Sequence, residues 1–169
     1  GSIAAPTAGL HFTNELLQKV EGRGVTIVKI TLHVGKGTFI PIKTQNIEEH
    51  RMEEEEYFIS EKSADILNQA LEEEKRIIAV GTTTTRALEN EISKNGKFTA
   101  GRERADIFIY PGYKFKAINA LITNFHLPQS TLLALVSAFC GRERILSAYE
   151  CAKENGYRFY SYGDAMLII

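Results

Sequence analysis

Apolar residues recur at two spacings along the chain, one typical of helices and one typical of strands. Apolar positions three and four residues apart predict helices after the capping residues Thr13 and Ser60, from about Arg86, over Thr131–Phe139 and over Arg142–Asn155. Short apolar or β-branched runs predict strands over Val25–Val34, Arg76–Val80, Ile107–Tyr110, Ala120–Thr123 and Ala165–Ile169. Because strands alternate with helices, we expect an α/β fold with a mostly parallel sheet flanked by helices.

Length and composition indicate one ordered domain. The chain has 169 residues, of which 44% are hydrophobic and 24% charged, so we expect a single α/β domain over 1–169 and exclude disorder. Its longest apolar stretches fall short of the ~20 residues that span a membrane, and we expect no membrane partner. The formal net charge of −1 gives no overall basic field, so a nucleic acid would be held by a local patch.

Cysteine and histidine usage bears on metals and on the cellular compartment. Cys140 and Cys151 lack CxxC spacing, and the four histidines lack any zinc-motif spacing, so we expect no metal site. Two isolated cysteines build no disulfide framework. This pattern is typical of a reducing compartment and predicts a cytoplasmic location.

Polar residues follow three of the predicted strands. The loops in question are Gly35–Thr38, Gly81–Arg86 and Asn124–Thr131. In open α/β sheets, ligands bind beyond the carboxyl ends of the strands. The sequence therefore predicts that His33, Thr82 and His126 lie at one rim of the sheet.

The threonine run Thr82–Thr85 has two interpretations. A helix beginning here would offer free N–H groups and a partial positive charge, and Arg86 would add a planar fork, which together suit a carboxylate or phosphate. The alternative is a plain helix cap with β-branched residues.

His126 also has two interpretations. Its imidazole can act as a general acid or base near neutral pH, with its pKa lowered by the positive end of the helix that follows. Alternatively, it bonds only to its own loop, and the same choice applies to His11 and His33. Asp164 precedes the last strand, so it joins the other polar loops only if that strand is antiparallel.

Two charged segments stand apart from these loops. The acidic run Glu53–Glu56 is typical of a solvated face. The segment Tyr110–Lys116 mixes aromatic and basic residues around a Pro-Gly turn. It suits either an RNA-binding loop or a hairpin with paired aromatic rings.

Several of these motifs occur together and in order: Ala5–Phe12, Leu32–Phe39, Val80–Thr83, Ile122–Pro128 and Tyr162–Met166. In this combination, over essentially the whole chain, the sequence resembles the S-adenosylmethionine:tRNA ribosyltransferase-isomerase family of queuosine biosynthesis. The resemblance implies an enzyme that acts on tRNA carrying 7-aminomethyl-7-deazaguanine at the wobble position. It transfers and isomerises the ribosyl part of S-adenosylmethionine to give epoxyqueuosine, and it releases adenine and methionine. The donor is consumed, and no separate cofactor or metal is implied.

The polar loops and the resemblance together predict a set of site residues. Those expected in catalysis are His126, His33 and Asp164. Those expected to bind substrate are Thr7, His11, Gly35, Gly37, Thr38, Thr82, Thr83, Arg86, Asn124 and Tyr162.

Two departures from the family pattern matter. Family chains are longer, and we expect this chain to be the C-terminal part of their large domain, as a fragment or a split protein, without their N-terminal half and its small β-barrel domain. Glu53 stands where the family usually has histidine. A non-catalytic RNA-binding remnant therefore remains the alternative to an active enzyme.

Overall fold

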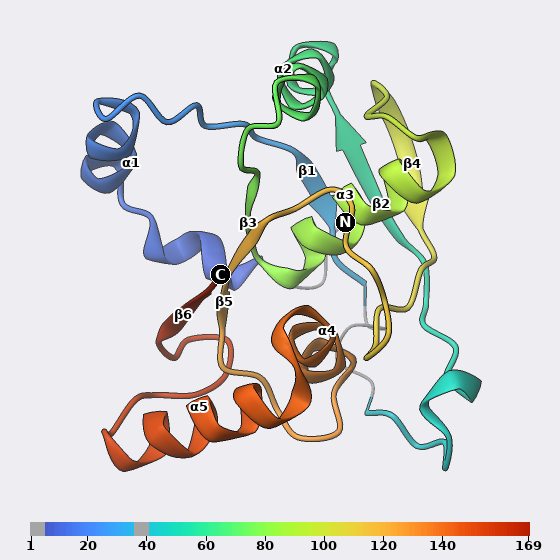
Figure 1. Cartoon of the computed structure of the whole chain (residues 1–169), viewed down its shortest axis with the longest axis vertical. Helices are drawn as coiled ribbons and strands as arrows, with labels where there is room; N and C mark the ends of the chain where they lie inside the picture. The colour runs from blue at the N-terminus through green and yellow to red at the C-terminus, as the bar shows by residue number, and fades with distance from the viewer. Residues whose placement is uncertain (1–5, 36–40) are drawn as a thin grey trace.

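The computed structural model describes residues 6–35 and 41–169 and confirms a mixed α/β fold (Figure 1). Its helices are α1 (Asn14–Glu21), α2 (Glu61–Glu72), α3 (Thr82–Asn95), α4 (Thr131–Cys140) and α5 (Arg142–Glu154), with short 3₁₀ helices η1 (Thr7–His11) and η3 (Ile47–Glu49). Its strands are β1 (Thr31–His33), β2 (Glu55–Ile59), β3 (Ile78–Val80), β4 (Gly101–Ala105), β5 (Ala120–Asn124) and β6 (Ala165–Ile168). Within these ranges, no helix has both the length and the apolar character needed to cross a lipid bilayer.

The strands form two small sheets instead of one mostly parallel sheet. The first has the order β1-β2-β4 and is antiparallel throughout. The second has the order β3-β5-β6, in which β3 and β5 run parallel and β6 runs antiparallel to β5. Parallel pairing needs a long crossover, and α3 lies in the connection between β3 and β5. The prediction of mostly parallel pairing is thus corrected: among the described residues, it holds for the β3–β5 pair alone.

Local cap signals are confirmed, whereas several strands differ from the prediction. The side chains of Thr13, Ser60 and Ser130 accept hydrogen bonds from the amides three residues ahead and so begin α1, α2 and α4. The predicted strand over 25–34 shortens to β1, and the one over 107–110 is irregular. Strands β2 and β4 were not predicted, because their charged residues hide the alternation of apolar positions.

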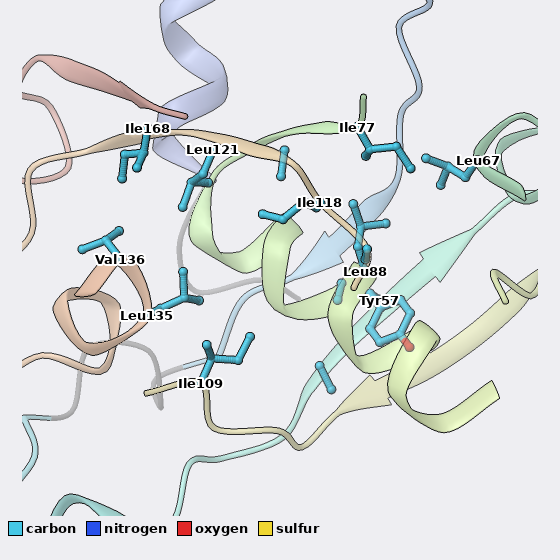
Figure 2. Close-up of a cluster of buried hydrophobic side chains, with 14 of the residues drawn as sticks. Tyr57, Leu67, Ile77, Leu88, Ile109, Ile118, Leu121, Leu135, Val136 and Ile168 are labelled. Carbon is cyan, nitrogen blue, oxygen red and sulfur yellow. The ribbon is translucent and has the colours of Figure 1, made fainter. Parts of the chain in front are cut away.

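Helix α3 lies between the two sheets and contacts strands of both (Figure 1). It begins at Thr82, a full turn earlier than predicted, directly after Gly81. Figure 2 shows the resulting core, in which Leu88 of α3 lies between Tyr57 of β2 and Leu121 of β5. Leu135 and Val136 of α4 close this core on the side of β5 and β6.

A buried ion pair fixes α3 against the first sheet. The Arg86 Nη1 donates to Glu55 Oε2 at 3.0 Å, and both side chains are buried. Its Nε donates to the Ile107 carbonyl at 2.8 Å, and its Nη2 donates to the Glu53 and Ala105 carbonyls at 2.7 Å each. Burial lowers the pKa of Arg86, and the Glu55 carboxylate opposes that shift. One guanidinium therefore joins α3 to β2, to the end of β4 and to the segment after it.

We expect Arg86→Met to lower the free energy of unfolding by about 3–5 kcal/mol, because it leaves the Glu55 carboxylate buried without its cation. Urea unfolding followed by circular dichroism measures this loss. The matched control is Arg102→Met, which removes an exposed pair with Glu56 at 2.8 Å and should cost less than about 1 kcal/mol. Equal losses in the two variants would contradict the role given to the buried pair.

Candidate functional site

A cleft lies at the carboxyl ends of β3 and β5. Five segments line it: η1, the end of β1, the first turn of α3, the β5–α4 connection and the loop before β6. The lining residues include Thr7, Val34, Thr82, Thr83, Asn124, His126, Ser130, Leu132, Tyr160 and Ser161. The backbone amide of Gly81 donates to the Ile122 carbonyl at 2.8 Å, which holds the start of α3 beside β5. Of the predicted site residues, the structure thus brings Thr7, Thr82, Thr83, Asn124 and His126 together.

Asn124 connects three of the sequence motifs inside this cleft. It is only 3% exposed. Its Nδ2 lies 3.1 Å from His11 Nε2 and 3.3 Å from the Gly163 carbonyl, and its Oδ1 accepts from the Thr7 hydroxyl at 3.3 Å. The buried side-chain amide of Asn124 therefore contacts residues that lie more than a hundred positions earlier in the sequence. Asn124 sets the position of His11 relative to the cleft.

His126 is buried and uncharged at neutral pH. It is 9% exposed, its Nε2 lies 3.0 Å from the Thr123 hydroxyl, and its backbone amide donates to the Tyr149 hydroxyl at 2.9 Å. Burial lowers its pKa to about 4. The predicted direction of the shift is confirmed, although its cause is burial and not the helix that follows. A neutral imidazole lining a cleft is the form that a general base requires.

Asp164 joins the polar loops because β6 is antiparallel to β5. Its carboxylate accepts from the backbone amide of Arg158 at 2.7 Å and from its guanidinium at 2.8 Å. These hydrogen bonds lower the pKa of Asp164 and keep it ionised. A Cβ at the preceding Gly163 would collide with the carbonyl of Arg158, so this tight turn requires glycine. Asp164 is therefore ionised and paired with Arg158, and this pair holds the turn that precedes β6.

Tyr162 points away from the cleft and is 84% exposed. Its neighbours Tyr160 and Ser161 line the cleft instead. No sequence signal distinguished them, because the turn that carries these two residues is positioned by contacts with Phe125, which is distant in the sequence. The backbone amide of Tyr160 donates to the Phe125 carbonyl at 2.8 Å.

The loop after β1 contributes less than predicted. His33 lies on the sheet surface with its Nε2 3.9 Å from Glu56 Oε1, while its neighbour Val34 faces the cleft, because successive strand residues alternate. The Gly35 amide donates to Glu55 Oε1 at 3.2 Å. Gly37 and Thr38 lie outside the described residues.

The described part of the chain also contains no cluster of three or more His, Cys, Asp or Glu side chains placed to hold a metal ion.

The prediction that Arg86 receives an anionic group of a substrate is wrong. Its guanidinium is buried and already donates to a carboxylate and three backbone carbonyls. The expectation of a solvated acidic run holds for Glu53 and Glu54, which are exposed, and is wrong for Glu55, which is a core residue that pairs with Arg86. Thr82 and Thr83 remain at the cleft, one turn ahead of the buried arginine.

Two of the aromatic residues of the Tyr110–Lys116 turn, Tyr113 and Phe115, pack against the core. The Tyr113 hydroxyl donates to Glu89 Oε2 at 3.0 Å, and Phe115 packs edge-to-face on Phe139 with ring centroids 4.8 Å apart. The turn lies outside the described strands, so it is not a paired hairpin. Lys114 and Lys116 are its exposed side chains, and they offer charge without a free aromatic platform.

Comparison with known proteins identifies close relatives. The sequence model of one family, described as queuosine biosynthesis protein, matches residues 1–168. Relatives from Fusobacterium nucleatum and Caldanaerobacter subterraneus are each 59% identical over 99% and 100% of this chain, and both are named S-adenosylmethionine:tRNA ribosyltransferase-isomerase. The chain spans about half the length of these relatives (48% and 50%). A crystal structure of S-adenosylmethionine tRNA ribosyltransferase from Thermotoga maritima is similar with a TM-score of 0.76 at 43% identity, covering 96% of this chain and 51% of that one.

The lowered pKa of His126 predicts acid sensitivity. Between pH 6.5 and about 4 the unfolded chain binds a proton at this histidine and the folded chain does not, so stability falls as the pH falls through this window. At about 1.4 kcal/mol per pKa unit, the loss attributable to His126 between pH 7 and pH 4.5 is about 2–3 kcal/mol. Urea unfolding at the two pH values measures it.

The matched variant is His126→Gln, which keeps a polar side chain but does not titrate. Its loss of stability between the two pH values should be smaller than that of the wild type by this amount. Equal losses in the two proteins would show that His126 titrates normally and is not held neutral.

Proposed function

Because this chain belongs to the queuosine biosynthesis protein family, we propose that its cleft is part of the active site of an S-adenosylmethionine:tRNA ribosyltransferase-isomerase. The reaction moves the ribosyl part of S-adenosylmethionine onto 7-aminomethyl-7-deazaguanine at the tRNA wobble position, isomerises it to give epoxyqueuosine, and releases adenine and methionine. S-adenosylmethionine is consumed as a substrate, and the reaction takes place in the cytoplasm, where tRNA is found.

The observation that carries this proposal is the convergence of the family motifs on one cleft. Thr7, Thr82, Asn124 and His126 come from three separate segments and line the same cleft. A domain that served only as a scaffold would have no need of a buried imidazole at a strand end, since buried polar groups carry a desolvation cost. The convergence therefore favours a reaction site over an inactive RNA-binding remnant.

His126 takes the role of general base. The reaction requires removal of a proton from the amine of the modified base or from a ribosyl carbon, and a neutral imidazole accepts it. Thr123 holds the ring through the contact at Nε2, and Asn124 places His11 close to the cleft as a second imidazole. Asp164, paired with Arg158, fixes the turn before β6 at the edge of the site. Thr7, Thr82 and Thr83 supply hydroxyl groups for the substrates.

The rest of a family-length protein completes the site. The cleft of this chain encloses about 90 Å³, whereas pockets for small molecules typically hold roughly 300–1,000 Å³. The chain also spans about half the length of its relatives. We therefore assign the remaining walls, and most of the contacts to tRNA, to the part of the family protein that this chain does not include.

The test joins this chain to the part of the Caldanaerobacter subterraneus relative that lies outside the match. Single-turnover reactions with saturating S-adenosylmethionine and tRNA are followed by adenine release and by mass spectrometry of the modified nucleoside. We expect the fusion to form epoxyqueuosine and His126→Gln to lower the rate on the order of 10²–10⁴-fold, because a positioned base is lost.

The control is Lys153→Gln, which removes only an exposed ion pair with Glu150 on α5 and should keep the full rate. A fusion that binds tRNA but forms no product, under conditions where the intact relative is active, would favour the RNA-binding remnant. A loss below about tenfold in His126→Gln would show that His126 is not the base, leaving His11 as the candidate beside the cleft.

A further inference from the structure

Two helices begin on the same wall of the cleft. The first residues of α3 (Thr82, Thr83) and of α4 (Thr131, Leu132) line a second, smaller cavity, and Thr82, Thr83 and Leu132 also line the cleft itself. The two helices are in contact. The small cavity therefore lies beside the cleft, between two helix N-termini.

The amides at these two N-termini are incompletely capped. Helix α3 begins after Gly81, which offers no side-chain cap. Helix α4 is capped by Ser130 at the Leu133 amide, and neither helix has an acidic residue in its first turn. Free first-turn amides and two helix dipoles make this wall electropositive, a property that favours an anion.

An unpartnered hydroxyl in the small cavity is an independent indication of a ligand. Thr131 is 2% exposed, and its hydroxyl has no hydrogen-bond partner among the described residues. Buried polar groups nearly always have one, so this donor is left for a group that enters the cavity. The cavity measures about 10 Å³, which is close to the space of a single water-sized oxygen atom.

The local charge balance permits an anion here. Glu55 also lines the small cavity, but its carboxylate is 3.0 Å from the Arg86 guanidinium, so the pair has no net charge. The electropositive amides are then the main electrostatic influence on an entering group.

We propose that the first turns of α3 and α4, together with the Thr131 hydroxyl, form an oxyanion subsite that takes one oxygen of a carboxylate or phosphate group. The subsite replaces Arg86 as the receiver of substrate charge at this end of the cleft. Its biological ligand rests on the proposed function, which supplies two sources of this chemistry: the carboxylate of S-adenosylmethionine and a phosphate of the tRNA.

The direct test uses the 169-residue chain and inorganic phosphate, independently of the proposed reaction. We expect saturable shifts of the Thr82, Thr83 and Leu132 amide signals in ¹H–¹⁵N NMR spectra, beyond those caused by chloride at equal ionic strength. Thr131→Val keeps the shape but removes the hydroxyl, and it should weaken phosphate binding about tenfold, the size expected for a hydrogen bond to a charged group. Thr131→Ser keeps the hydroxyl and should keep the affinity.

Thermal unfolding without ligand separates binding from folding. Thr131→Val should not lower the melting temperature, because the hydroxyl it removes has no partner in the unliganded protein. The matched control, Ser137→Ala, removes a hydroxyl further along α4 and should leave phosphate binding unchanged. Absence of saturable shifts, or the same affinity in Thr131→Val and wild type, would overturn the subsite.

The source of the anion is then decided with the fusion protein used above. If the subsite takes the donor carboxylate, S-adenosylmethionine binds more tightly than its decarboxylated form, and Thr131→Val removes the difference. If it takes a tRNA phosphate, Thr131→Val weakens tRNA binding instead. Phosphate binding at these amides without turnover by the fusion would contradict the proposed function alone, and turnover without either effect of Thr131→Val would contradict the subsite alone.

Discussion

Arg86 and Glu55 form an ion pair in the interior of the protein, and the arrangement of the two sheets depends on this ion pair. Two charges leave water there, and the cost is offset only because the guanidinium also donates to three backbone carbonyls. Further along α3, Glu89 accepts hydrogen bonds from the backbone amides of residues 116–118, and Glu91 accepts one from the Tyr57 hydroxyl at 2.8 Å. Helix α3 is thus attached through polar groups to segments on several sides.

This attachment is what makes a precise site possible. Because α3 is fixed against the first sheet at Arg86, its first turn is held in place where β3 and β5 of the second sheet end. Asn124 then connects η1 and the loop before β6 to the same point. Side chains held by helix and strand ends vary less in position than side chains on free loops, and catalysis depends on such placement.

The cleft combines two kinds of chemistry on one wall. A neutral imidazole, His126, lies near the end of β5, and the uncapped first turn of α3 offers positive potential beside it. The first suits a proton acceptor, and the second suits an anionic part of a substrate. The cleft is small, about 90 Å³, and the chain spans about half the length of its relatives.

The sequence by itself determined what depends on neighbouring residues. The caps at Thr13 and Ser60, the helices they begin and the polar strand ends were all readable, because a cap is made within three residues of its partner. The family motifs were readable for the same reason, as short strings with fixed spacing. Tertiary structure alone decided the rest: the burial of Glu55 in an acidic run, the partner of Arg86 and the direction of β6. Those depend on residues 31 or more positions apart, and only packing brings such residues together.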